Sequence, residues 1–267
     1  MTDAEQSTAE RRIFPLERGS NFRDLGGHVG ADGRIVRWRR LFRSGSTAML
    51  TERDIEEVAR LKLAGVIDLR SVEERQIAPS PLAERLGVPH VTRDYSAVTM
   101  YLQLYSRMGG LAFSAVYCDL PRLFQADYAR MFDTLLGDDG GYVVSCSGGA
   151  DRAGVGVALI LSALGVGREA ILEDFMLSEL HRRPENELPE FRAADFPTNP
   201  LAQYYAMVAR QPSWRKSRRL VNDEGVPNLV GSFGRIESDW GSLDRYLEEG
   251  LGMDRGRVDA LRARYLE

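Results

Sequence analysis

The segment from Val143 to Gly154, VVSCSGGADRAG, constrains the fold of this chain more than any other. The β-branched residues before Ser145 are typical of a buried strand, and the apolar run 153–164, closed by a glycine, is typical of a buried helix. Only a short glycine-containing turn separates the two. A strand that passes through such a turn into a helix is the unit in which backbone N–H groups and the helix dipole bind phosphate.

The turn carries residues with reactive chemistry. Cys146 and Arg152 enclose five residues, which are Ser147, Gly148, Gly149, Ala150 and Asp151. The glycines allow the N–H groups to converge, and an arginine fork can bind two phosphate oxygens. A thiol that faces these donors is expected to have a pKa below its usual value of about 8.5, which makes Cys146 a candidate nucleophile. The alternative is a small buried cysteine at the end of a strand.

The order of the expected elements predicts an α/β fold with a mainly parallel sheet. A hairpin is expected in NFRDLGGHVGADGR, and Thr51 with Asp54 fits a capping box at the start of a helix that ends at Gly65. The expected strands are RLFRSG, VIDLRS, 88–91 and YVVS, and the further helices are 153–164, 165–181, 201–210, 230–240, 242–250 and 254–265.

Residues 95–136 have helical periodicity and are interrupted by Gly109, Gly110 and Pro121, which predicts two or three helices. Aromatic residues recur along this region, and such a stripe usually packs in the core, although a lid over the substrate is the alternative. They are Tyr101, Tyr105, Phe113, Tyr117, Phe124, Tyr128 and Phe132. We expect a single domain over 1–267, with residues 1–12 mobile and 95–136 forming a helical lid or insert.

Composition excludes several classes of function. No apolar run approaches the roughly 18 residues that span a bilayer, so integral membrane association is not expected. The N-terminus lacks the features of a signal peptide, which predicts a cytoplasmic protein and leaves non-classical secretion open. The net charge of -4 argues against nucleic-acid binding. With two cysteines and three scattered histidines, neither a metal nor another cofactor is expected.

The turn resembles the Cys-x5-Arg loop of the cysteine-based phosphatases, in particular that of the bacterial tyrosine/serine-protein phosphatase family. GSNFRDLGG, RLFRSG, VIDLRS, ALILSALGV, ILEDFMLS and WGSLDRYLEEGLGM resemble successive motifs of that family in the same order, over nearly the whole chain. The resemblance implies the cysteine-phosphatase α/β fold with additional lid helices. It also implies hydrolysis of phosphotyrosine without a cofactor, with dual specificity for phosphoserine/threonine, or activity on phosphoinositides, in some members.

By this resemblance, Cys146 is the nucleophile that forms a phosphocysteine and Arg152 binds the phosphate. Residues 147–151 supply the backbone amides, and Asp151 matches an aspartate that resembles the general acid of related lipid phosphatases. The substrate is then a phosphorylated protein or a small aryl phosphate.

Asp68 of VIDLRS is the alternative general acid. Its structural interpretation is an aspartate at a strand end that pairs with the backbone or with Arg70, and this interpretation is the stronger. Asn21, Arg23 and Asp24 are expected to support the wall of the site.

The family loop reads His-Cys-x-x-Gly-Lys-Asp-Arg-Thr-Gly, and this chain has Ser145, Ala150 and Ala153 at three of its positions. Loss of the histidine and the hydroxyl is expected to raise the pKa of the thiol. At about 1.5 kcal/mol for each lost hydrogen bond, turnover slows by about one to three orders of magnitude. Ser145 and Ser147 could compensate in part.

Ala150 removes the cation that the family associates with highly charged substrates, so we expect phosphoinositides to be poorer substrates than aryl phosphates. The arginines of RWRRLFR (37–43) and WRKSRR (214–219) could replace that charge, although solvated faces are the simpler interpretation.

Three functions fit these residues. The first is an active phosphatase, and the second is a weakly active module that recognises phosphorylated partners. The third is a sulfurtransferase or arsenate reductase that uses the same thiolate. Because Cys146, Asp151 and Arg152 are all retained, the first is favoured, and Cys118 gives no sign of acting as a second redox thiol.

Overall fold

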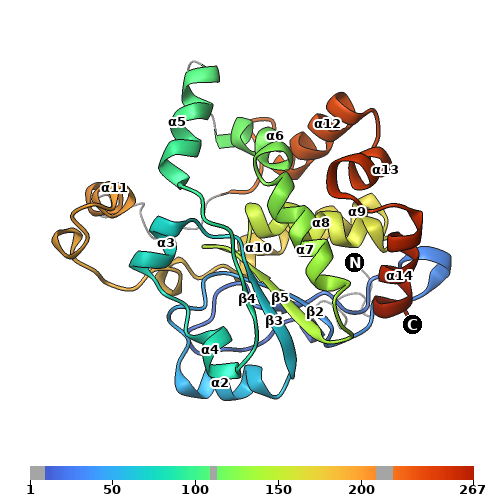
Figure 1. Ribbon diagram of the computed structural model, residues 1–267, viewed down its shortest axis with the longest axis horizontal. Coiled ribbons are helices and arrows are strands. Elements are labelled where there is room, and N and C mark those ends of the chain that lie inside the picture. The colour runs from blue at the N-terminus through green and yellow to red at the C-terminus, as the bar shows by residue number, and fades with distance from the viewer. Residues whose placement is uncertain (1–9, 109–112, 209–218) are drawn as a thin grey trace.

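The computed structural model describes residues 10–108, 113–208 and 219–267, and its centre is a five-stranded sheet of order β1-β2-β5-β3-β4 (Figure 1). β1 is antiparallel to β2, and the other neighbouring pairs are parallel. The mainly parallel α/β sheet that the sequence predicts is therefore confirmed. The strands are β1 (Arg23–Asp24), β2 (Leu41–Ser44), β3 (Leu63–Asp68), β4 (His90–Val91) and β5 (Gly141–Ser145).

Helices surround the sheet (Figure 1). The α-helices are α2 (Glu52–Ala59), α3 (Val72–Ile77), α4 (Leu82–Leu86), α5 (Ala97–Met108), α6 (Phe113–Leu123), α7 (Gln125–Leu135), α8 (Arg152–Ala163), α9 (Arg168–Met176), α10 (Ser178–His181), α11 (Pro200–Val208), α12 (Asn228–Trp240), α13 (Leu243–Arg245) and α14 (Arg255–Tyr265). Short 3-10 turns are η1 (Ala31–Gly33), η2 (Pro184–Asn186) and η3 (Ala193–Asp195), and η4 (Tyr246–Gly250) is a π-helix.

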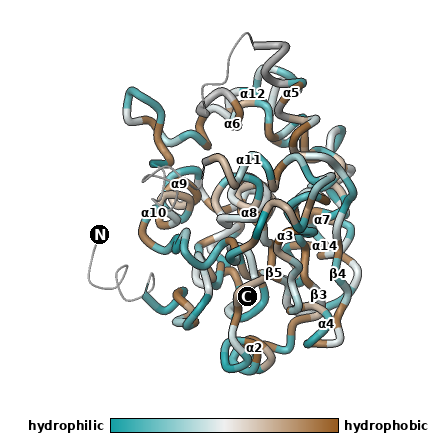
Figure 2. Tube along the Cα trace, turned by 90° about the vertical axis from the view of Figure 1, so that its left-hand side faces the viewer, coloured by the Kyte–Doolittle hydropathy of each residue, from teal (hydrophilic) through white to brown (hydrophobic). Residues whose placement is uncertain are grey.

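The sheet is covered by helices on both faces. Successive side chains of each strand point to opposite sides and therefore enter two different hydrophobic clusters. On β5, Val144 belongs to a hydrophobic cluster with residues of α7, α8 and α14, whereas Val143 belongs to one with residues of α2 and α4. Figure 1 shows these two groups of helices on opposite sides of the sheet, and Figure 2 shows hydrophobic residues along the central strands. The strand that leads to the cysteine is thus buried on both faces.

The helix expected over 51–65 is shorter than predicted. Its start is confirmed, because the Thr51 side chain accepts from the Asp54 N–H and the Asp54 side chain accepts from the Thr51 N–H. The helix ends at Ala59, however, and Gly65 lies inside β3. Parallel pairing of this segment with β5 outweighs its helical periodicity, and a side chain at Gly65 would meet the ring of a tyrosine on β5 at 2.9 Å.

The described residues of the segment 95–136 include three helices, α5, α6 and α7. Four of their aromatic residues are fully buried, which confirms the core interpretation for Tyr117, Phe124, Tyr128 and Phe132. The other three positions, Tyr101, Tyr105 and Phe113, and the pair Gly109–Gly110 lie outside the residues whose side chains the structure describes. α6 packs against α12, which connects this region to the C-terminal part of the chain.

The expected mobile segment 1–12 falls mostly on residues that the structure does not describe. Its last residue, Arg12, is buried, and its Nε donates to the carbonyl of Gly26 at 2.8 Å, so the mobile segment does not extend that far. Within the described ranges, no helix combines the length and the apolar character that crossing a bilayer requires.

Candidate active site

The candidate site is the loop between β5 and α8, called here the 146–152 loop. β5 lies between β2 and β3, and Ser145 at its end is in register with Ser44 and Asp68 of these neighbours. Cys146 follows directly and is only 2% exposed. The loop therefore begins at the centre of the carboxyl edge of the sheet and leads into the first turn of a buried helix.

The peptide groups of the loop are oriented by donors from other segments. The carbonyls of residues 147–149 accept hydrogen bonds, in this order, from the Ser46 N–H at 2.8 Å, Asn21 Nδ2 at 3.1 Å and Arg43 Nη2 at 2.6 Å. Among the described residues, no backbone carbonyl accepts from the N–H groups of residues 147–151. Because the carbonyls are held by the surrounding wall, the N–H groups remain available for an anion at the start of α8.

Both glycines of the loop lie in close contact with other segments. Gly149 has a φ of +65°, and a Cβ there would lie 2.5 Å from the carbonyl carbon of Ser44. A Cβ at Gly148 would lie 2.6 Å from Cζ of Arg182. Glycine at these positions thus allows the close approach of β2 and of an arginine side chain, in addition to a tight turn.

Arg152 is held in place by a carboxylate that the sequence analysis did not identify. Its guanidinium donates to both carboxylate oxygens of Glu74 on α3, at 2.6 and 2.7 Å, and to the hydroxyl of Tyr95 at 2.7 Å. Ser147 also donates to Glu74. Burial acts to raise the pKa of Glu74, but Arg152 and the hydrogen bonds together lower it to about 2. In the sequence, Glu74 shows only the capping-box pattern with Ser71.

The thiol of Cys146 does not have the lowered pKa that the loop alone predicts. Burial raises the pKa of Cys146, and the negative charges of Asp151 and Glu74 add to this effect. Arg152 and a hydrogen bond from the Ala153 N–H act in the other direction without reversing it. Desolvation of the thiolate therefore outweighs the stabilisation that Arg152 and the Ala153 N–H provide. The pKa of Cys146 is raised, which is the direction expected from the loss of the family histidine and hydroxyl.

The three residues that differ from the family loop, Ser145, Ala150 and Ala153, are all buried. The Ser145 hydroxyl donates to the Ile67 carbonyl at 3.3 Å, so it helps to join β5 to β3. Ser147 is engaged with Glu74, as described above. Ala150 and Ala153 are buried in the same hydrophobic cluster as the cysteine.

Asp151 lies in the loop and is partly exposed, and the hydroxyl of Tyr117 donates to its Oδ1. Tyr117 belongs to α6 and is fully buried, and burial with the neighbouring Asp151 raises its pKa, so it remains a protonated donor. The helical region 95–136 therefore contacts the loop through Tyr117, and also through Tyr95 and Tyr128, whose hydroxyl donates to the Arg152 carbonyl at 3.0 Å. Sequence reasoning placed Tyr117 in the core but gave no signal for its contact with Asp151.

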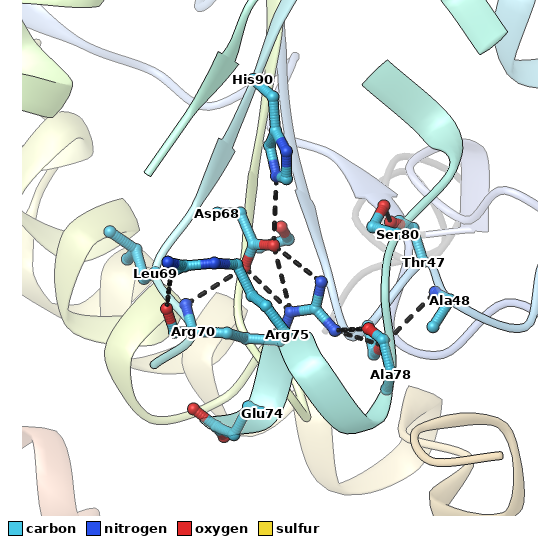
Figure 3. Close-up of polar contacts among 12 residues, drawn as sticks. Thr47, Ala48, Asp68, Leu69, Arg70, Glu74, Arg75, Ala78, Ser80 and His90 are labelled. Atoms are coloured by element: carbon cyan, nitrogen blue, oxygen red, sulfur yellow. Dashed lines mark hydrogen bonds and ion pairs between the residues drawn. The ribbon is translucent and has the colours of Figure 1, made fainter. Parts of the chain in front are cut away.

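Asp68 lies at the end of β3 in a different environment. Its carboxylate accepts from Arg70 Nε at 2.9 Å and Nη2 at 2.7 Å, and it lies 3.2 Å from His90 Nε2 (Figure 3). Burial acts to raise the pKa of Asp68, but Arg70 and His90 lower it well below its usual range. The ion pair with Arg70, which is the structural interpretation of this aspartate, is present.

The residues expected to support the wall divide into two groups. Asn21 holds the loop directly, and Arg23 bonds to Asn21 and donates to the Asp174 carbonyl at 2.8 Å. Asp24 accepts from the N–H groups of Gly26 and Arg39, and within the described part of the chain it makes no hydrogen bond to the loop.

Asp174 of α9 is a further residue that sequence reasoning missed. It accepts from Arg43 Nη1 at 2.5 Å, and Arg43 in turn holds the loop. Arg43, one of the arginines of the 37–43 cluster, is therefore buried behind the loop and is not part of a solvated face. The 214–219 cluster lies almost entirely outside the described residues. In the described part of the chain, no group of three or more His, Cys, Asp or Glu side chains is arranged to hold a metal ion.

Comparisons with known proteins show which family the chain resembles. A family model described as the tyrosine phosphatase family matches residues 14–267. The chain is also similar to a protein of Cupriavidus necator that carries the name "Putative tyrosine-protein phosphatase H16_A0669". The two are 28% identical over 270 residues, which cover 98% of this chain and 92% of that protein.

Proposed function

This chain belongs to the tyrosine phosphatase family, and on that premise we propose that it hydrolyses phosphotyrosine through a phosphocysteine on Cys146. The observation that supports this most directly is the orientation of the 146–152 loop. Its carbonyls are held by Ser46, Asn21 and Arg43, so its N–H groups are left for the oxygens of a phosphoryl group above the thiol.

In the first step, the thiolate of Cys146 attacks phosphorus in line with the bond to the tyrosine oxygen. A sulfur–phosphorus bond forms as that bond breaks, and its electron pair leaves with the phenolic oxygen. Asp151 gives its proton to this oxygen, because a phenoxide with a parent pKa of about 10 is a poor leaving group near neutral pH. Asp68 is not assigned this role, since its pair with Arg70 keeps it ionised.

In the second step, water attacks phosphorus and gives a proton to the carboxylate of Asp151. The sulfur–phosphorus bond breaks, its electrons return to the sulfur, and inorganic phosphate is released. Because burial raises the pKa of Cys146, the neutral thiol competes with the thiolate in the free enzyme, and turnover is slower than the loop alone would give.

Arg152 binds two equatorial oxygens of the phosphoryl group, and Glu74 holds its guanidinium ready for this contact. Phosphotyrosine and other aryl phosphates are the preferred substrates, phosphoserine and phosphothreonine are slower, and polyphosphoinositides are poorer because Ala150 supplies no charge. An alkyl phosphate depends more strongly on proton donation by Asp151, because its leaving group is more basic.

The test is hydrolysis of para-nitrophenyl phosphate between about pH 5 and pH 8, a range that lies between the ordinary pKa values of a carboxylic acid and of a thiol. We expect a burst of nitrophenol followed by steady turnover in the unmodified protein, and loss of both in Cys146→Ser. Cys118→Ser is the matched control, because it removes the other cysteine of the chain and retains the loop.

Turnover that continues in Cys146→Ser would contradict the phosphocysteine mechanism. Tight binding of a phosphotyrosine peptide by the unmodified protein without burst or turnover would instead identify a module that recognises phosphorylated partners.

A further inference from the structure

A second cation lies beside the 146–152 loop, on a segment that the sequence motifs do not include. Arg182 follows α10, and its guanidinium lies where a side chain of residue 148 would be. A Cβ on Gly148 would be 2.6 Å from both Cζ and Nε of Arg182 and 2.7 Å from its Nη2. Gly148 and Arg182 are therefore matched, because any other residue at position 148 would displace the guanidinium.

The guanidinium is held in this position by a carboxylate. Arg182 donates from Nε and Nη2 to the two oxygens of Glu187 at 2.9 and 2.7 Å, and both side chains are largely buried, at 14% and 11% exposure. Glu187 also accepts from the hydroxyl of Ser20 at 2.9 Å. Nε and Nη2 of Arg182 thus form a pair of parallel donors next to the loop, a geometry that matches a carboxylate.

The charge of Arg182 acts on the reactive groups of the loop. Burial acts to lower the pKa of Arg182, but Glu187, Asp151 and Cys146 together raise it. The loop itself contributes Ala150, a buried uncharged side chain, where the family pattern has lysine. A cation near the scissile phosphate is therefore supplied by the segment after α10, at a site made accessible to it by Gly148.

We propose that Arg182 binds a second anionic group that the substrate carries next to its scissile phosphate, and that this group is an acidic side chain of a phosphotyrosine peptide. In the substrate-free protein, Glu187 occupies the fork, and the carboxylate of the peptide replaces it or shares it on binding. The inference rests on the proposed function, because it names the class of phosphopeptide that the same site prefers.

The experiment compares two phosphotyrosine peptides that differ only in having aspartate or asparagine beside the phosphotyrosine. We expect the unmodified protein to prefer the acidic peptide by about tenfold in kcat/KM, mainly through KM, on the scale of one charge-assisted hydrogen bond. Arg182→Gln should reduce this preference to about twofold or less. A soluble inositol bisphosphate forms a third arm, because its second phosphate could occupy the same fork.

Two further variants separate this role from a structural one. Glu187→Gln retains the shape of the partner but removes its charge, so we expect the preference for the acidic peptide to increase. Arg192→Gln is the matched control, because Arg192 is 83% exposed and pairs with Asp195 outside the loop contacts; it should leave the preference unchanged.

An unchanged preference in Arg182→Gln, with Cys146-dependent hydrolysis of para-nitrophenyl phosphate intact, would overturn this inference alone. A preference for inositol bisphosphate that depends on Arg182, with no discrimination between the peptides, would overturn the assignment to an acidic side chain. If the unmodified protein hydrolyses neither para-nitrophenyl phosphate nor the peptides, the proposed function itself fails.

Discussion

At the scale of single residues, two aspartates with the same chemistry receive different roles from their surroundings. Asp68 is fully enclosed by Arg70 and His90, and its pKa is lowered, so it cannot carry a proton near neutral pH. Asp151 is partly exposed in the loop and has one oxygen engaged by Tyr117, which leaves the other oxygen for a substrate. The groups around each carboxylate therefore determine which of the two aspartates we propose as the proton donor.

Replacement of Asp68 should therefore lower mainly the stability of the protein, and replacement of Asp151 should lower mainly its activity. Asp68→Asn leaves Arg70 buried without a counter-charge, and we expect a loss of about 3 kcal/mol in unfolding free energy with activity per folded molecule largely retained. Asp151→Asn should lower kcat by about 100-fold or more while changing stability little. Urea unfolding and steady-state kinetics measure the two effects. A catalytic loss in Asp68→Asn as large as that in Asp151→Asn would reverse the assignment of the acid.

The candidate residues of the loop could be proposed from the sequence because they are contiguous and their spacing carries the signal. Glu74, Asp174 and Arg182 could not, because each acts through a contact with a segment far away in the sequence. Locally, Glu74 shows only a helix cap, and arginine and aspartate on helices are typical of solvated faces. Their contacts depend on burial in the folded chain, and local sequence patterns do not predict which charged residues become buried.

At the scale of elements, the loop is built by close approach between β2, β5 and α8. The same pairing explains why the helix expected over 51–65 ends early, at Ala59. The apolar residues after Ala59 fit a helical period, but as β3 they pair in parallel with β5 and fill both faces of the sheet. Capping residues gave the start of α2 correctly because a cap is a local arrangement.

Gly149 provides a test at this scale. Gly149→Ala forces a Cβ to 2.5 Å from the backbone of Ser44 at a φ of +65°, so we expect a loss of about 1 to 3 kcal/mol in unfolding free energy together with most of the activity. Gly234 in α12 is the control, since nothing lies within 4 Å of a Cβ there. Gly234→Ala should raise stability by about 0.5 to 1 kcal/mol. Equal effects of both substitutions in urea unfolding would contradict the close-approach argument.

At the scale of the whole molecule, a buried ionic network joins the N-terminal segment, β2 and α9 behind the loop. Its members include Arg23, Arg43 and Asp174, and His28 lies among them with its Nε2 unpaired within the described part of the chain. Burial lowers the pKa of His28 to about 4, and the charge of Arg12 adds to this effect. The surroundings of His28 therefore favour the neutral form of its imidazole.

The lowered pKa of His28 leads to a prediction for how the stability of the protein depends on pH. Its folded pKa of about 4 is below the unfolded value of about 6.5, so the unfolded state binds the extra proton in this interval. Stability should fall by up to about 3 kcal/mol as the pH drops from about 6.5 to 4. His28→Gln should flatten most of this fall, leaving a smaller part from His181, whose pKa burial also lowers.

Urea unfolding at a series of pH values checks this prediction. Glu74 affects stability at lower pH, because its pKa falls from 4.5 to about 2 on folding. Its contribution to the free energy of unfolding should be lost only below about pH 4.5, both in the unmodified protein and in His28→Gln. An unmodified protein whose stability is constant between about pH 6.5 and 4.5 would contradict the role of His28.

The rigid support of the 146–152 loop also bears on how the enzyme clears its site. Donors from Ser46, Asn21 and Arg43 hold the loop carbonyls in the substrate-free protein, and Glu74 holds the guanidinium of Arg152. The inorganic phosphate that remains after the reaction meets the same N–H groups and the same guanidinium as the ester did. A site that is preorganised for one oxyanion is therefore preorganised for the other, and the support that aids capture of the substrate also slows release of the product.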